Sequence, residues 1–120
     1  MAITDAVVAQ LVQWWCRSGA EVERPLLSDD FEWDSGLETI GRSDFLSAWQ
    51  YMGRIEGMRF VDLWVASDRA TVMFEGNDAV TGLTHRFCWM ASYEGDHLRR
   101  LRTCVGQVPG RERAGSETPT

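Results

Sequence analysis

The chain has 120 residues, of which 44% are hydrophobic, and this length and composition are typical of one globular domain with a single core. That hydrophobic content excludes global disorder. The formal net charge is -6, with 12 Lys and Arg residues against 18 Asp and Glu residues. Phosphate neutralisation needs clustered cations, so we expect no nucleic-acid partner.

The cysteine pattern and the short length of the apolar stretches predict a cytosolic location. Cys16, Cys88 and Cys104 give an odd count without CxxC spacing, which favours reduced thiols in a cytosolic protein over a disulfide framework. The first residues, MAITDAVVAQ, have no basic segment before an apolar run, so no secretory leader is expected. No stretch reaches the roughly 18 apolar residues of a membrane span. We therefore expect a cytoplasmic protein without a membrane partner.

The first half of the chain predicts helices separated by a short strand. Apolar residues recur every three or four positions from Ile3 to Trp15, which indicates one face of an amphipathic helix that begins near Thr4 or Asp5 and ends near Gly19. A brief second helix is expected within residues 20–27, limited by Pro25.

A short strand is expected at residues 31–34. A third helix should start near Arg42 or Ser43 and close at Gly53 or Gly57. Its buried side would carry four residues: Phe45, Leu46, Trp49 and Met52.

From Met58 onward the apolar pattern has a period of two, which predicts strands at residues 58–66, 69–77, 83–93 and 97–105. The expected fold is α+β, with a curved, mostly antiparallel sheet wrapped around three N-terminal helices. It would occupy residues 1–107 as one domain, followed by a disordered tail at 108–120. Both alternating sets of strand 58–66 are apolar, so both sheet faces need cover. Because the helices can cover only one face, a second subunit is expected to cover part of the other, giving a homodimer.

The stretch from Leu27 to Trp49, LSDDFEWDSGLETIGRSDFLSAW, contains a short strand with an acidic residue, a loop and a Gly-Arg helix start. Followed by several short strands, this order resembles the nuclear transport factor 2-like superfamily, and within it SnoaL-like polyketide cyclases and ketosteroid isomerases. The resemblance covers residues 4–106 and fits best at Gly41-Arg42 and at the final strand, HLRRLRTCV. It implies a cone-shaped fold with a pocket and a cofactor-independent reaction.

In ketosteroid isomerases the general base is an Asp just after the short strand, and the resemblance assigns that place to Asp34. A carboxylate beside Trp33 at the mouth of an aromatic pocket would be partly desolvated, which brings it closer to the basicity that proton abstraction needs. The alternative is an Asx turn before Gly36. The spacing from the Asp29-Asp30 pair is one residue shorter than expected. Since a one-residue slip reverses a strand's faces, Glu32 and Trp33 compete for the inward position.

The oxyanion side of the isomerase pattern differs in this chain. The first helix offers Trp14 and Trp15 where the family has a Tyr, and Trp89 stands at the late-strand position of its protonated Asp. Thr103 stands where limonene epoxide hydrolases have their last-strand Asp. A steroid isomerase and an epoxide hydrolase are both disfavoured.

His85 is the second candidate for acid–base chemistry, since it shares a strand face with Phe87 and Trp89. With Asp34 it resembles a reduced version of the scytalone dehydratase site. The alternative is a histidine solvated, or bonded to backbone, near the start of its strand.

Asp62 interrupts the face of Phe60 and Trp64. Facing inward it would be a buried carboxylate in need of a partner, and facing outward it would be a solvated charge. Arg99, Arg100 and Arg102 form the one basic cluster, which suits surface salt bridges. Residues expected to line the pocket, or alternatively to fill the core, are Trp33, Trp49, Phe60, Trp64, Phe87 and Trp89, with Asp62 and Thr103 as polar members.

No metal site is predicted, because the two histidines stand twelve positions apart without a nearby ligand set. The leading hypothesis is an isomerase, cyclase or dehydratase that transfers protons on an apolar carbonyl or polyketide-like substrate, without a cofactor. The alternative is a non-catalytic ligand-binding or dimeric scaffold domain of the same fold.

Overall fold

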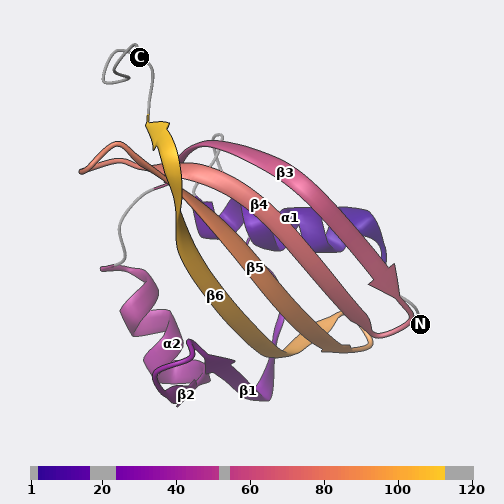
Figure 1. Cartoon of the computed structure of the whole chain (residues 1–120). Helices are drawn as coiled ribbons and strands as arrows, with labels where there is room; N and C mark the ends of the chain where they lie inside the picture. The colour runs from indigo at the N-terminus through magenta and orange to yellow at the C-terminus, as the bar shows by residue number, and fades with distance from the viewer. Residues whose placement is uncertain (1–2, 17–23, 52–54, 113–120) are drawn as a thin grey trace.

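The structure is a computed structural model that describes residues 3–16, 24–51 and 55–112. Two helices, α1 and α2, and one six-stranded sheet make up these residues (Figure 1). Their bounds are α1 Asp5–Cys16, β1 Leu27–Asp34, β2 Thr39–Gly41, α2 Arg42–Trp49, β3 Ile55–Ala66, β4 Arg69–Asp78, β5 Leu83–Glu94 and β6 His97–Glu112.

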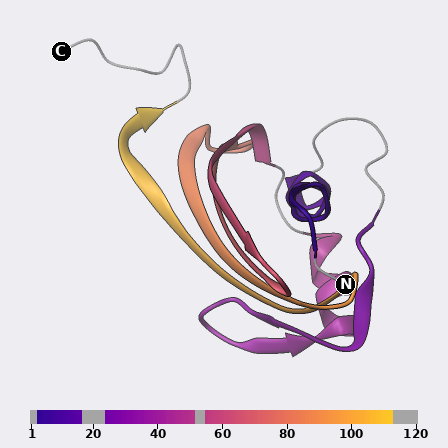
Figure 2. The ribbon, with the colours of Figure 1, turned by 90° about the vertical axis from the view of Figure 1, so that its right-hand side faces the viewer.

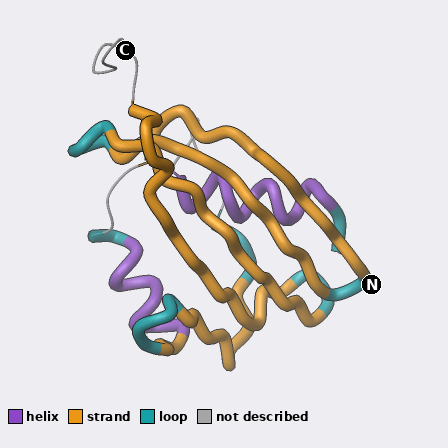
Figure 3. The backbone as a smooth tube through the Cα atoms, in the orientation of Figure 1, coloured by secondary structure: helices purple, strands orange, loops and turns teal. Residues whose placement is uncertain are grey.

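The strand order in the sheet is β2-β1-β6-β5-β4-β3. Strands β3 to β6 form an antiparallel meander, whereas β1 lies parallel to β6 and antiparallel to β2. The sheet is strongly curved, and α1 runs through the hollow of the curve (Figure 2). We call the side that faces α1 the inner face and the opposite side the outer face. Figure 3 shows α1 crossing behind the strands of the meander, so the helix and the sheet form two separate layers.

Strand alternation explains which residues form the core. In β5 the buried positions are Phe87, Trp89, Ala91 and Tyr93, and the residues between them are more exposed. Helix α1 supplies a completely buried stripe against this face. The fully buried side chains are Val8, Leu11, Val12, Cys16, Phe31, Phe45, Val72, Phe74, Trp89, Leu98 and Leu101.

The predicted α+β fold class is confirmed, although the described residues form two helices where three were expected. The first helix, the Gly41-Arg42 helix start and the four late strands are also confirmed. Two expectations about the first half differ from the structure. Leu27, expected to end a helix, begins β1, and α2 ends at Trp49 with Gln50 as its C-cap rather than at a glycine. Met52 and Gly53, and residues 20–23 of the expected second helix, lie outside the described residues.

The last strand is longer than the pattern indicated. Strand β6 continues to Glu112, past Gln107, where the domain was expected to end. Strand β5 pairs with β6 as far as Leu83 opposite Glu112. Residues 108–112, which were expected to begin a disordered tail because of their composition, are therefore part of the sheet. The expected tail beyond that point, residues 113–120, lies outside the described residues.

A bulge in β3 reverses the faces of its side chains. Phe60 pairs with Phe74, but Asp62 pairs with Met73, so Val61 is an extra residue in the ladder. Phe60 therefore shares the inner face with Phe74, while Asp62 and Trp64 lie on the outer face. The expectation that Phe60 and Trp64 share one face is wrong, because a period-two pattern does not record an inserted residue.

Candidate functional site

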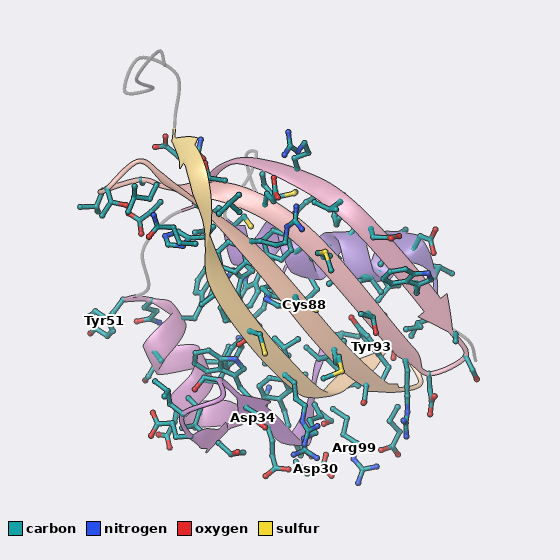
Figure 4. The ribbon with its side chains drawn as sticks, viewed as in Figure 1. Asp30, Asp34, Tyr51, Cys88, Tyr93 and Arg99 are labelled. Atoms are coloured by element: carbon teal, nitrogen blue, oxygen red, sulfur yellow. The ribbon has the colours of Figure 1, made fainter. Side chains whose placement is uncertain are left out.

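Asp34 closes β1 and lies on the outer face. It pairs in register with Arg102, and its Oδ2 is 3.4 Å from the Arg102 Nε, with the Asp34 side chain 28% exposed. Its Oδ1 accepts a hydrogen bond of 2.9 Å from the Gly36 N–H, which is the Asx turn weighed as the alternative. Figure 4 shows Asp34 at the end of the molecule formed by β1 and β2. This placement differs from the expected one at the mouth of an aromatic pocket.

Trp33 faces inward, at the position for which the sequence left Asp34 and its neighbours as alternatives. Its Nε1–H donates a 2.9 Å hydrogen bond to the Thr103 Oγ1, which joins β1 to β6. Its ring packs edge-on against Trp15 and Phe45, at centroid distances of 5.5 Å each. Of the two neighbours weighed in the sequence, Trp33 therefore faces inward and Asp34 faces outward.

His85 lies on the inner face of β5, half-buried, with its ring centroid 6.4 Å from that of Phe87. Its register partners are Gly76 and Gln107. The structure does not bring it together with Asp34, since the two residues are on opposite faces of the sheet. Asp34 and His85 therefore cannot act together as an acid–base pair on one side of a substrate.

His85 has a different acidic neighbour. The pKa of the Asp78 carboxyl lies below its ordinary value, chiefly because the Thr81 and Val80 amides donate hydrogen bonds to it, with a smaller attraction to His85. These amides belong to the β4–β5 turn, which projects from the sheet in Figure 1. The main role of the Asp78 carboxylate is therefore to accept the hydrogen bonds that stabilise the β4–β5 turn.

Trp89 is the most enclosed polar side chain of the inner face. It is 0% exposed, and its Nε1–H has no hydrogen-bond partner among the described residues. Its ring makes edge contacts with Trp15 at 4.8 Å and Phe74 at 4.9 Å, and Phe74 in turn stacks on Phe87 at 4.7 Å. An aromatic surface thus surrounds one unused hydrogen-bond donor.

The other expected pocket residues are divided between core and surface. Trp49 ends α2 and stacks on Trp14 at 4.3 Å, as part of the core. Phe60 is 36% exposed. Trp64 and Asp62 lie on the outer face, where Trp64 is 56% exposed and Asp62 accepts a hydrogen bond from the Leu63 N–H. Asp62 is thus the outward charge of the two alternatives, and neither residue lines an inward pocket.

Sequence reasoning missed two adjoining surface depressions at the N-terminal end of β1. Their volumes are about 760 and 650 Å³, and they share Asp29, Asp30 and Arg42. Asp30 lies beside Arg99, with Oδ2 3.5 Å from Nε (Figure 4). The basic cluster does supply surface salt bridges, as expected for Arg99 and Arg102. The sequence signal that could have indicated this region is the acidic Asp29-Asp30 pair together with the basic Arg99-Arg100 pair, because opposite charges favour contact between the two strands.

The second depression is also lined by Tyr93, whose hydroxyl is buried without a partner among the described residues. Burial raises the pKa of Tyr93 well above its usual range. Among the residues weighed for the site from the sequence, Glu32 lines the second depression, whereas Asp34, His85 and the expected pocket aromatics line neither.

Two general properties of the described part of the chain bear on function. It holds no helix long and apolar enough to cross a membrane. Nor do residues 3–16, 24–51 and 55–112 contain a group of three or more His, Cys, Asp or Glu side chains placed to hold a metal ion.

Comparison with known proteins identifies the fold. No protein-family model matches the chain, and no curated protein sequence matches it. Among solved structures, an NTF2-like protein of unknown function from Burkholderia xenovorans superposes with a TM-score of 0.72 at 12% identity, over 92% of this chain and 86% of that one. A protein from Kribbella flavida, provisionally named as a ketosteroid isomerase, gives 0.65 at 19% identity, over 96% and 89%.

A third structure is a hypothetical protein from Catenulispora acidiphila with a ketosteroid isomerase-like fold, in complex with trimethylamine. It gives a TM-score of 0.59 at 16% identity, over 85% of this chain and 86% of that one. At these identities the likeness shows the fold alone, and that fold is the nuclear transport factor 2-like cone.

Proposed function

We propose that this NTF2-like cone binds a small, largely apolar molecule against the inner face of β5, with the Trp89 Nε1–H as hydrogen-bond donor to an oxygen of that molecule. The observation that carries the proposal is the complete burial of this donor without a partner among the described residues. A buried polar group left unpaired costs about 1–3 kcal/mol, which a carbonyl or phenolate acceptor would recover.

The surroundings of Trp89 indicate the class of ligand. The contacting rings are those of Trp15 and Phe74, and Phe87 extends the same surface. Trp89 and Phe74 are themselves 0% exposed, so a planar aromatic ligand reaches the indole only when a neighbouring side chain moves aside. The ligand then buries area against these rings, and a single acceptor oxygen satisfies the indole. In the resemblance described above, Trp89 stands where ketosteroid isomerases have a donor to the substrate oxygen. An indole N–H can supply one hydrogen bond there, although it cannot supply a proton.

The test is ligand-induced thermal stabilisation with a panel of phenols, naphthols and polycyclic ketones. Binding to the native state raises stability by RT ln(1 + [L]/Kd), so a saturable shift measures the affinity. Trp89→Phe keeps an aromatic ring and removes the donor, and we expect it to weaken binding by about 0.5–1.5 kcal/mol, up to roughly tenfold in Kd.

Trp14→Phe is the matched control, because Trp14 is also buried but stacks on Trp49 in a different part of the core. It should lower stability and leave the Kd unchanged. The proposal is wrong if no compound stabilises the wild-type protein, or if both variants bind as tightly as the wild type does.

Acid–base catalysis is the second candidate function, supported by the isomerase-like fold and by His85 on the same inner face as Trp89. For any compound of the panel that is converted, His85→Gln should lower kcat. Asp34→Asn should leave kcat unchanged, because Asp34 lies on the outer face beside Arg102. A large loss of kcat in Asp34→Asn, with unchanged stability, would instead restore Asp34 as the base.

We also propose that two copies of the chain pair through the β3 side of the outer face. Trp64 is 56% exposed there, and Val61 at the adjoining bulge is 43% exposed, which leaves apolar surface for a partner of the same kind. Trp64→Glu should convert a dimer into a monomer in sedimentation analysis. A wild-type protein that sediments as a monomer at high concentration would exclude this assembly.

A further inference from the structure

Two thiols and one thioether lie in a single row across the outer face of the sheet. Met73 on β4 is the register partner of Cys88 on β5, and Cys88 is the register partner of Cys104 on β6. Partners directly opposite each other point to the same face, with Cβ atoms about 4.5–5.5 Å apart. Residues far apart in the sequence thus bring three sulfur-bearing side chains together.

The row is accessible and its thiols are free. Cys104 is exposed, Cys88 is half-buried, and neither forms a disulfide. Because Phe87 and Trp89 fill the inner face, strand alternation turns Cys88 outward. Figure 4 shows Cys88 midway along β5, away from the Asp30–Arg99 end of the molecule. The row is therefore separate from both the inner face and the surface depressions.

From this arrangement we propose that Cys88 and Cys104, with Met73 as a third ligand, bind one soft metal ion, with monovalent copper as the physiological candidate. Thiolate and thioether ligands select Cu(I) over hard cations. Each thiol releases its proton to solvent as its sulfur binds the metal, so the site carries two thiolates and one monovalent cation.

Distances favour a bridging metal over a disulfide. A disulfide needs Cβ atoms about 3.5–4.5 Å apart, which lies below the usual spacing of directly opposed strand residues. A metal–thiolate bond is about 2.3 Å long, so one ion can bridge two sulfurs up to roughly 4.6 Å apart. The two opposed cysteines can hold such an ion while the strands keep their pairing.

The ligand count separates copper from zinc. A structural zinc site has four ligands in tetrahedral array, and the described residues offer no group of three or more His, Cys, Asp or Glu side chains placed to hold a metal ion. Asp62 continues the row beyond Met73, but its carboxylate already accepts a hydrogen bond from the Leu63 N–H. Two or three sulfur ligands suit an ion that accepts low coordination numbers.

The test is an anaerobic titration of the reduced, full-length protein with Cu(I) in competition with bicinchoninate, whose copper complex is coloured. We expect one Cu(I) per chain. Loss of an outer-shell partner of a metal site costs roughly 10- to 100-fold in affinity, and loss of a ligand in Cys88→Ser or Cys104→Ser should cost more than that. Met73→Leu should weaken binding less, because the two thiolates remain.

Two variants serve as controls. Cys16→Ala removes a cysteine that is buried at the end of α1, and Met58→Leu removes a methionine that packs against the core, so both should bind Cu(I) like the wild type. X-ray absorption of the loaded protein should show sulfur as the only neighbour of copper. Circular dichroism of each variant should confirm that it is folded.

Several results would overturn the proposal. They are a wild-type protein that takes no Cu(I) from bicinchoninate, a Cys88→Ser variant of unchanged affinity, and a folded protein whose two outer thiols do not react with a thiol reagent. Rapid formation of a Cys88–Cys104 disulfide with oxidised glutathione, without copper binding, would likewise assign the row to redox chemistry.

Discussion

The hydrogen bond between Trp33 and Thr103 should contribute measurably to stability, because it connects β1 to β6 across 70 positions of sequence. Thr103→Val removes the acceptor with little change of shape and leaves the indole N–H unpaired. The penalty for an unpaired buried group is about 1–3 kcal/mol. Since Trp33 is only half-buried, we expect a value near the lower end of that range.

Trp33→Phe removes the donor and also the larger ring that packs on Trp15 and Phe45. Its cost should remain below the roughly 3–5 kcal/mol of truncating a buried Trp to Ala. In the double variant the lost hydrogen bond is counted once, so the two single effects should exceed the combined effect by about 0.5–1.5 kcal/mol.

Urea unfolding followed by far-ultraviolet circular dichroism is the appropriate assay, since fluorescence would itself change with the loss of Trp33. Unchanged m values would show that each difference reflects stability and not compactness. Thr71→Val, a strand threonine on the outer face, measures the intrinsic effect of the same substitution. Additivity of the two Trp33 and Thr103 changes within about 0.3 kcal/mol would refute the reasoning.

Two further predictions concern the core. A Cβ at Gly76 would lie 2.2 Å from the Ile55 Cγ2, so Gly76→Ala should cost about 1–3 kcal/mol by overpacking. Ile55→Ala in the same chain should recover part of that loss in urea unfolding, and no recovery would mean that the clash is not the cause. Burial raises the pKa of Cys16 from 9.0 to about 12. The unfolded thiol therefore ionises first, and stability should fall as pH rises from about 9 towards 12, more steeply in the wild type than in Cys16→Ala. Equal slopes in the two proteins would contradict this assignment.

Period and composition predicted the sheet well because its strands bury one face regularly. In β5 the alternation from Phe87 to Tyr93 has no interruption, so the sequence pattern and the burial pattern agree. In β3 the bulge at Val61 moves Trp64 to the outer face, and no residue type marks that insertion. The four-residue spacing from Phe60 to Trp64 therefore predicted a shared face that does not exist.

The site was harder to predict than the fold because it depends on single-residue register. Asp34 matched the family position by order along the chain, yet its neighbour Trp33 occupies the inward place. The choice between them is decided by pairing with β6, a strand that begins more than 60 positions later. The local sequence predicted the Asx turn at Gly36 correctly as an alternative. It contains no information about which residues of β1 pair with β6.

The inner and outer sites share β5, and this makes their independence testable. Cys88 lies between Phe87 and Trp89 in sequence, but its side chain is on the opposite face of a strand that is hydrogen-bonded to β4 and β6 on both edges. A strand held on both sides cannot easily shift to transmit a change, so coupling between the faces should be small. Cu(I) loading should therefore leave the affinity for a naphthol that stabilises the protein unchanged within about twofold. Because coupling is reciprocal, the naphthol should equally leave the Cu(I) affinity unchanged. A mutual effect of tenfold or more, about 1.4 kcal/mol, would show that β5 has two positions and that ligand and metal select between them.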